Sequence, residues 1–252
     1  TEYTNRKDEI GELAIAFNAM ADSLAQAEQK RSEFVANVSH ELKTPMTTIA
    51  GFADGILDGT IPPEKERESL QVISSETRRL SRLVRRMLEL SRLQSSERVA
   101  AQEQFDVAEV LLRVLVSLES KITEKDLDVQ TQLPDVPVMV WGDPDAVTQV
   151  CYNLLDNAVK FSSPQGRLTL RITTKAGKAY IAIGNQGETI PPQQLTHIFD
   201  RFHKADSSRS THKDGVGLGL YIVKTILNTY KEDITVTSQD GFTEFTFTLS
   251  EV

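Results

Sequence analysis

Cysteine, an excess of basic charge and long apolar runs are scarce or absent in this sequence. The single cysteine, Cys151, cannot form an internal disulfide, and one unpaired thiol fits a reducing compartment best. The net charge is −8 and the pI is about 5.1, which argues against duplex nucleic acid as a partner, because phosphate binding needs a basic face. No run of about eighteen apolar residues occurs, so no segment is predicted to span a bilayer.

The four histidines share no metal-ligand spacing, and no signal peptide is present. What is present is the composition of a soluble globular protein, with 252 residues, 39% hydrophobic and 25% charged, enough for one large domain or two ordinary ones. The chain starts in the middle of a pattern without an initiator methionine. We therefore expect part of a longer protein, which contacts a membrane only through a segment upstream.

Two long helices are predicted in the first third of the chain. Residues 8–42 carry apolar residues in alternating steps of three and four, which is typical of a coiled-coil seam, and the pattern ends at the Gly-Thr-Ile-Pro-Pro run of 59–63. The second helix follows with Leu70, Ile73, Thr77, Leu80, Val84, Met87 or Leu88, and Leu93 at helical spacing. Such helices form an antiparallel hairpin. Because each helix has one apolar stripe to bury, two copies would close a four-helix bundle, and we predict a homodimer.

The remainder of the chain has a mixed pattern after a polar linker. Residues 106–122, 143–161 and 218–229 are predicted to be helices, with a short helix from Pro191. Strands are predicted at 127–133, 137–141, 167–174, 179–185, 234–237 and 243–249, with a hairpin turn at 175–178. Asp143 and Pro144 are expected to start their helix as N-cap and first residue. The fold class is α+β: a mostly antiparallel sheet with helices on one face.

Residues 37–51 are the most informative run. His40 directly precedes Glu41, and Thr44 lies four residues later on the same helical face as His40. Pro45 is expected to interrupt the helix, because proline has no N–H to donate and clashes with the preceding turn. An imidazole, a carboxylate and a hydroxyl near such a kink are what a reaction centre would contain.

A second constellation lies more than a hundred residues downstream, in the predicted helix 143–161. Asn153, Asn157 and Lys160 follow each other at steps of four and three, so they share one helical face. Amide oxygens beside an ammonium group suit a hydrated Mg²⁺ that carries phosphates. For this helix alone, a polar solvent-facing side is an equally good interpretation.

Two glycine-containing segments extend this constellation. Residues 184–191 end a predicted strand, and a glycine there lets the backbone approach a flat ring closely, although an ordinary turn also explains it. Residues 215–220 read Gly-Val-Gly-Leu-Gly-Leu and open a helix, a common way to hold a phosphate. This segment follows a polar stretch, 203–214, that we expect to be mobile, instead of a strand. It therefore fits a movable lid over a nucleotide better than a dinucleotide-binding fingerprint.

Taken together, these residues resemble the sensor histidine kinases of two-component signalling. The resemblance rests on an H-box at 40–45, an N-box at 153–161, a G1-box at 185–189, an F-box at 198–202 and a G2-box at 215–220, with 8–13 similar to the end of a HAMP module. It implies the end of HAMP and a signalling helix at 1–29, a dimerisation and phosphotransfer hairpin at 30–96, a linker at 97–104 and a catalytic α/β-sandwich ATP-binding domain at 105–252. It also implies the cytoplasmic portion of a bacterial membrane sensor.

The resemblance implies ATP and Mg²⁺ as cofactors, and a second copy and a response regulator receiver domain as partners. His40 would be the nucleophile that takes the γ-phosphoryl group, Glu41 its base, and Thr44 would help to place water when the regulator is dephosphorylated. Asn157 would be the Mg²⁺ ligand. The other candidates for nucleotide binding are Asn153, Lys160, Phe161, Asn185, Gly187, Arg209, Gly215, Gly217, Leu218 and Gly219.

Two departures from the family pattern lie in the G1-box. Asn185 stands where the family has an aspartate, so a hydrogen bond to adenine should be weaker by about 1 kcal/mol. Thr189 replaces a glycine and removes backbone freedom. Related ATPases carry a glutamate in place of Asn153, and its absence favours transfer to histidine over hydrolysis. Two alternatives stay open: a GHKL-type ATPase, and a degenerate kinase that acts as a signalling and binding module.

Two further groups of residues have ordinary interpretations. Cys151 lies among apolar neighbours and is predicted to be a small core residue. The arginines of the second helix are interpreted as a solvated face balanced by glutamates, with a docking surface for a response regulator as the alternative. They are Arg78, Arg79, Arg82, Arg85 and Arg86.

Overall fold

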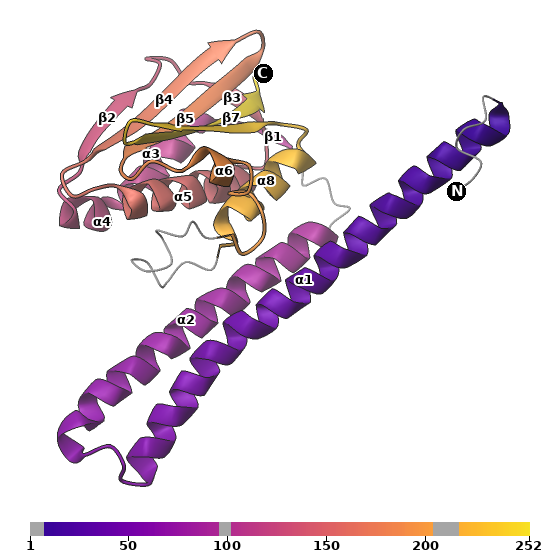
Figure 1. The fold of residues 1–252 in the computed structure, drawn as a ribbon. Coiled ribbons are helices and arrows are strands. Elements are labelled where there is room, and N and C mark those ends of the chain that lie inside the picture. The colour runs from indigo at the N-terminus through magenta and orange to yellow at the C-terminus, as the bar shows by residue number, and fades with distance from the viewer. Residues whose placement is uncertain (1–7, 96–101, 204–216) are drawn as a thin grey trace. The chain divides into compact units, whose positions relative to one another are not determined.

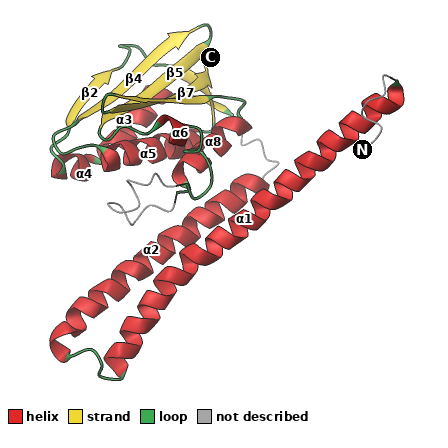
Figure 2. Ribbon diagram, in the orientation of Figure 1, coloured by secondary structure: helices red, strands yellow, loops and turns green. Residues whose placement is uncertain are grey.

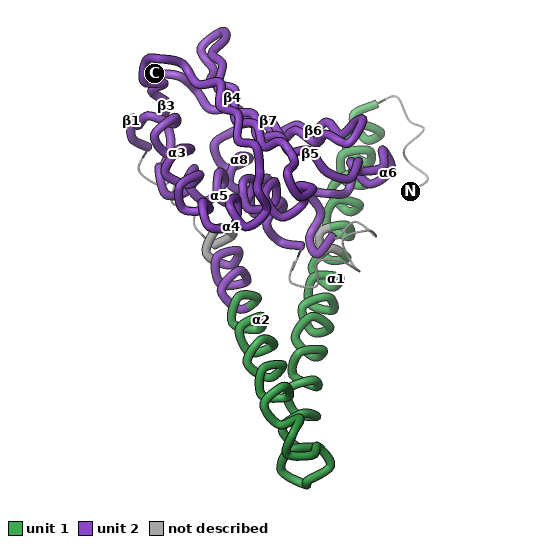
Figure 3. The backbone as a smooth tube through the Cα atoms, turned by 90° about the vertical axis from the view of Figure 1, so that its left-hand side faces the viewer, with its two compact units in different colours: residues 1–83 green, residues 84–252 purple. Residues whose placement is uncertain are grey.

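The structure is a computed structural model that describes residues 8–95, 102–203 and 217–252. The chain divides into two compact units, Thr1–Leu83 and Val84–Val252, which we call the hairpin unit and the sheet unit (Figure 3). Among the described residues, no helix combines the length and the apolar character that crossing a bilayer requires.

Two long helices make the antiparallel hairpin that the apolar pattern predicts. Helix α1 spans Glu9–Leu57 and begins at Asp8, whose carboxylate accepts a hydrogen bond from the Gly11 amide at 3.1 Å. Helix α2 spans Pro63–Ser95 and starts with Pro63, which suits a first helical turn. Between the helices, Gly59 has a φ of +77°, a left-handed conformation that glycine adopts without strain. The hairpin is the long red helical pair in Figure 2.

Pro45 does not interrupt α1, so that expectation was wrong. The helix runs for 49 residues with Pro45 inside it. Proline removes one N–H donor and costs about 3 kcal/mol in a helix interior, but its fixed φ is itself helical. Pro45 is also buried, and packing around its ring offsets part of that cost. His40 therefore lies in an uninterrupted stretch of helix.

Helix α2 presents apolar side chains on more than one face. Leu83 and Leu90 are buried, with 2% and 1% of their surfaces exposed. In contrast, Leu70, Val84 and Leu88 are exposed by 55%, 43% and 56%. Leu83 and Leu90 lie outside the predicted stripe, whose members Leu70, Val84 and Leu88 are left open within one chain. These open residues have the heptad-like spacing of a face that packs against another helix.

The sheet unit contains one five-stranded sheet in the order β2-β4-β5-β7-β6. Its strands are β2 (Asp128–Gln132), β4 (Arg167–Lys175), β5 (Lys178–Gln186), β6 (Ile234–Gln239) and β7 (Phe242–Ser250). Only β2 and β4 pair in parallel, and every other pair is antiparallel, as predicted. One side of the sheet is buried with a period of two, because alternate strand residues point to the same face. The buried set includes Leu168, Leu170, Ile181, Ile183, Phe247 and Leu249.

Helices cover this one face of the sheet (Figure 1). They are α3 (Val107–Ser117), α4 (Glu119–Glu124), α5 (Pro144–Phe161), α6 (Pro192–Leu195) and α8 (Gly219–Thr229). Asp143 caps α5 as predicted and accepts from the Asp145 amide at 2.9 Å. The helix predicted at 106–122 is instead two helices, because Leu118 takes φ −103° and ψ 4° while its side chain is buried. A period of 3.6 does not reveal a break of one residue.

A two-stranded sheet completes the unit. It pairs β1 (Glu103–Asp106) with β3 (Met139–Gly142) in antiparallel fashion. Glu103 and Gln104 fall within the predicted linker, yet they lie in β1 because their backbones pair with Gly142 and Trp141. Their side chains are exposed, so the sequence shows no apolar alternation there.

Candidate functional site

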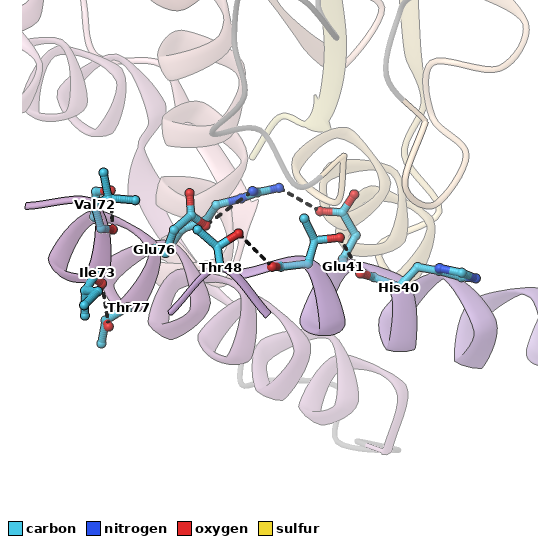
Figure 4. A network of polar contacts seen from close by, with 10 residues as sticks. His40, Glu41, Thr48, Val72, Ile73, Glu76 and Thr77 are labelled. Carbon is cyan, nitrogen blue, oxygen red and sulfur yellow. Dashed lines mark hydrogen bonds and ion pairs between the residues drawn. The ribbon is translucent and has the colours of Figure 1, made fainter. Parts of the chain in front are cut away.

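His40 is exposed on α1 and is followed by Glu41, which is partly buried. Consecutive residues of a helix do not face each other, and in Figure 4 the His40 imidazole points away from the Glu41 carboxylate. The Thr44 hydroxyl, one turn later, donates a hydrogen bond to the His40 backbone carbonyl at 3.2 Å. The imidazole is thus presented outward from an uninterrupted helix.

Glu41 is engaged by an arginine from the other helix of the hairpin. Arg79 donates from Nη2 to Glu41 Oε2 at 3.2 Å, and its Nη1 lies 3.6 Å from Glu76 Oε2. The Arg79 and Glu41 side chains are only 18% and 25% exposed. The interpretation of Arg79 as part of a solvated face was therefore wrong, because a pattern along one helix does not show what lies across the hairpin. Figure 4 shows Glu41 and Glu76 directed into this network.

A shallow groove runs along α1 beside the histidine. Its lining residues lie at helical spacing and mix apolar with small polar side chains: Ser39, Leu42, Lys43, Met46, Thr47 and Ala50. Met46 is 57% exposed. Leu42 and Met46 thus place apolar side chains on α1 shortly after His40.

The polar face of α5 gathers the three predicted N-box residues. Asn153, Asn157 and Lys160 are all partly exposed, while Leu154 and Leu155 are fully buried. The Asn153 amide nitrogen is buried and has no hydrogen-bond partner among the described residues. The Asn153 Oδ1 lies 3.6 Å from the place that a Cβ on Gly219 would occupy. The fold thus brings the N-box next to the start of α8 and leaves a buried amide ready for a further partner.

The carboxyl end of α5 meets the end of β5. Asn185 is buried at the end of β5, and a Cβ on Gly187 would lie only 2.2 Å from the Phe161 carbonyl oxygen. Residue 187 must therefore be a glycine, because two backbones approach each other closely there. The approach to a flat ring, which the sequence suggested for this glycine, stays a prediction. Phe161 itself is 40% exposed, and the Lys160 ammonium lies 5.0 Å from its ring centroid, a cation–π contact.

Thr189 has a contact that the sequence did not reveal. Its hydroxyl accepts a hydrogen bond from the Gly241 amide at 2.8 Å, and the Gly187 amide donates to the Gly241 carbonyl at 2.8 Å. The G1-box is thus tied to the turn between β6 and β7. Thr189 anchors this loop through its hydroxyl.

The G2-box begins at a tight backbone crossing. Gly217 has a φ of +73°, and a Cβ on it would lie 2.7 Å from the Phe202 carbonyl carbon. The Phe202 amide donates to the Gly217 carbonyl at 2.8 Å, so the F-box and the G2-box are held together. The Leu218 side chain is fully buried, which leaves only its backbone to meet a ligand. Arg209 and Gly215 lie outside the described residues.

Cys151 is the core residue that the sequence predicts. It is fully buried, and burial raises the pKa of its thiol to about 12. A thiol held neutral in this way is a packing group and not a nucleophile.

Comparison with known families decides the identity. Residues 142–252 match the family model described as histidine kinase-, DNA gyrase B-, and HSP90-like ATPase. Residues 30–96 match the His Kinase A (phospho-acceptor) domain, and residues 2–26 match the HAMP domain. The chain belongs to the sensor histidine kinases.

Comparisons with individual relatives of this sensor histidine kinase support the same family assignment. It is 35% identical over 242 residues to sensor histidine kinase YclK of Bacillus subtilis, covering 93% of the chain and 51% of YclK. The mycobacterial sensor histidine kinase MprB is 30% identical with a TM-score of 0.53, over 60% of the chain and 98% of that structure. Histidine kinase ThkA, solved with response regulator protein TrrA, shares the fold at a TM-score of 0.72 and 24% identity, over 91% of the chain and 66% of ThkA. The chain spans about half the length of the curated relatives it matches.

Sequence reasoning named Arg79 but missed its contact with Glu41. Glu76, Arg79 and Leu83 follow at steps of three and four, so their spacing places them along one side of α2. Only the structure shows that Glu41 of α1 lies opposite this side.

Proposed function

We propose that this chain is the signalling and catalytic portion of a membrane-attached sensor, which transfers the γ-phosphoryl group of ATP to His40 and then to an aspartate of a response regulator. The observation that carries the proposal is an exposed histidine on a helical hairpin, in the same chain as an ATPase-like unit whose buried Asn153 amide nitrogen has no hydrogen-bond partner within the described part of the chain. The HAMP match at residues 2–26 supports attachment to a membrane upstream.

The chemistry at His40 is a displacement at phosphorus. One ring nitrogen forms a bond to the γ-phosphorus while the bond from phosphorus to the ADP oxygen breaks, and ADP leaves with that electron pair. Glu41 holds the proton of the other ring nitrogen and so keeps the imidazole nucleophilic. For this, the Glu41 carboxylate turns from Arg79 toward the imidazole.

The nucleotide is held by the sheet unit. The Asn185 side-chain oxygen, at the end of β5, would accept from the adenine amino group. Lys160 on α5 and the backbone N–H groups at the glycine-containing start of α8 would hold the phosphates. The buried Asn153 amide supports this assignment, because a buried donor without a partner is rare unless a ligand completes it.

The residues present also suit Mg²⁺. Asn157 offers an amide oxygen, a hard ligand of the kind Mg²⁺ accepts together with phosphate oxygens and waters. The described residues contain no group of three His, Cys, Asp or Glu side chains that could hold a metal ion by themselves, so Mg²⁺ would be bound together with the phosphates. Bound Mg²⁺ neutralises charge on the phosphates during transfer.

The second transfer needs a receiver domain beside His40. The groove that includes Leu42 and Met46 supplies apolar contacts for it, and ThkA is known with a response regulator protein. Thr44, one turn after His40, would orient a water for the reverse reaction, removal of the phosphoryl group from the regulator. Two copies of the chain form the bundle on which this occurs.

A single incubation with γ-labelled ATP and Mg²⁺ separates the possible activities. The proposal requires label that accumulates on the protein and disappears when Mg²⁺ is chelated. Steady release of labelled phosphate without labelled protein would indicate an ATPase instead. Absence of both, together with no heat in a calorimetric titration with Mg-ATP, would indicate a binding module and overturn the proposal.

A further inference from the structure

Lys125 follows α4 and binds the carboxyl end of α5. Its Nζ donates to the backbone carbonyls of Val159 at 3.0 Å, Lys160 at 2.7 Å and Ser162 at 2.9 Å. The last carbonyls of a helix lack partners within the helix, and a cation there is also favoured by the helix dipole. One partly buried ammonium thus satisfies three of them.

The same end of α5 is held from the opposite direction by β5. The Ser163 amide donates to the Gln186 carbonyl at 2.9 Å, and Ser162 pairs with Gly187. The Phe161 carbonyl, which Lys125 does not bind, is the one that Gly187 approaches. The final turn of α5 is therefore fixed between an ammonium and a strand end.

This final turn carries part of the nucleotide site. Lys160 and Phe161 belong to it, and the nearby Gly187 backbone fits only if the Phe161 carbonyl keeps its place. A shift of the turn would change the separation of the Lys160 ammonium, which meets phosphates, from the Asn185 end of β5, which meets adenine. Small displacements of positioned groups have large effects on binding and rate.

We propose that Lys125 is a positioning residue for the nucleotide: it fixes the last turn of α5 so that Lys160 and the Gly187 backbone keep the spacing that Mg-ATP needs. The inference rests on the proposed function, because it concerns the same nucleotide site. Lys125 does not touch the ligand itself and acts through backbone carbonyls. Its replacement should therefore change nucleotide affinity more than the amount of folded protein.

The chain offers a matched control one turn earlier. Lys121 on α4 also reaches α5, where its Nζ lies 2.6 Å from Asp156 Oδ1, a contact between two side chains that are 54% and 23% exposed. Calorimetric titration with Mg-ATP on the 252-residue chain is expected to give a Kd raised about tenfold for Lys125→Met and within about twofold of wild type for Lys121→Met. Lys125→Arg keeps the charge and should recover part of the affinity.

Calorimetry separates affinity from folding. A purely structural role would lower the binding stoichiometry of Lys125→Met and leave Kd unchanged, which would overturn the inference while wild-type binding upholds the proposed function. No heat with wild type would overturn both. If Lys125→Met does not fold, Lys125→Gln takes its place: a Kd raised about fourfold is expected, and a wild-type Kd would overturn the inference.

Discussion

Glu41 is the residue whose surroundings bear most directly on the chemistry of His40. Its carboxylate is bound by Arg79 from α2 and points away from the neighbouring imidazole (Figure 4). To serve as the base proposed for His40, this carboxylate would first have to turn away from Arg79, which holds its Oε2. The pair therefore links the geometry of the hairpin to the readiness of the histidine.

The Arg79–Glu41 pair should contribute measurably to the hairpin. A double-mutant cycle with Arg79→Met and Glu41→Gln is expected to give a coupling energy of about 0.5–1 kcal/mol in urea unfolding, since both side chains are largely shielded. The same cycle with exposed Arg78→Met in place of Arg79 should give a coupling near zero. Equal coupling in the two cycles would mean that the contact is not specific.

Gly187 should not tolerate a side chain. In Gly187→Ala the Cβ would lie 2.2 Å from the Phe161 carbonyl oxygen, so either β5 or the end of α5 must move, at a cost of about 1–3 kcal/mol. We expect lower stability to urea and weaker binding of Mg-ATP. Gly142→Ala is the control, because its nearest neighbour would be a Phe105 ring carbon at 3.6 Å. If Gly187→Ala kept wild-type stability and Mg-ATP binding, the Gly187 and Phe161 backbones would have to lie further apart than the structure shows.

At the scale of elements, the turns between strands and the helix caps stabilise the sheet unit around α5. Ala176 and Gly177 take φ values of +53° and +74° between β4 and β5, and Asp240 and Gly241 repeat this between β6 and β7. Such turns match the twist of antiparallel strands. The second of them also anchors Thr189, so the edge of the sheet supports the loop that follows β5.

A buried carboxylate in the segment between α8 and β6 fastens that segment to β5 and β7. Glu232 accepts hydrogen bonds from Lys178 Nζ at 2.7 Å and from the Thr248 and Ser250 hydroxyls at 2.6 Å. Burial alone would raise the pKa of Glu232, but the hydrogen bonds from Lys178, Ser250 and Thr248 outweigh it and lower that pKa. A lowered pKa in the folded state stabilises the protein above the unfolded-state pKa, and this stabilisation is lost as the pH falls through the folded-state pKa.

Glu232→Gln should therefore destabilise the sheet unit in a pH-dependent way. We expect a loss of about 1–3 kcal/mol at neutral pH, because hydrogen bonds to a charged group are the stronger kind. The difference from wild type should shrink as the pH falls through the folded-state pKa of Glu232, which lies below the ordinary value for a glutamate. Urea unfolding at neutral and at acidic pH measures it, with the exposed Glu103→Gln as control. If the difference in unfolding free energy between wild type and Glu232→Gln stayed constant with pH, the charge of Glu232 would not be the source of the stabilisation.

At the scale of the whole molecule, much of the architecture was predictable. The periods of 3.6 and 2, the Asp143 cap and the glycine turns are local signals, so the hairpin, the sheet and α5 followed from them. The continuation of α1 through Pro45 and the pairing of β1 with β3 did not follow from local signals, because they depend on tertiary contacts. The same holds for the site: the face of Asn153, Asn157 and Lys160 is a matter of spacing, whereas the contacts of Arg79, Thr189 and Lys125 join residues far apart in sequence.

Dimerisation is the prediction that belongs to this scale. Leu70, Val84 and Leu88 lie exposed on α2, and covering them is favourable by about 25 cal/mol per Å². Sedimentation should show a dimer, which Val84→Glu weakens by at least about tenfold in dissociation constant. Leu57→Glu at the end of α1, 84% exposed, should leave the dimer intact. A wild-type chain that sediments as a monomer would contradict the prediction.

The central claim is that His40 accepts the phosphoryl group that the sheet unit supplies from ATP. The most direct measurement compares wild type with His40→Gln after incubation with γ-labelled ATP, with Mg-ATP binding measured on both. Wild type should carry label that acid removes and alkali does not, and His40→Gln should carry none while still binding Mg-ATP. Label retained by His40→Gln would contradict the assignment of His40.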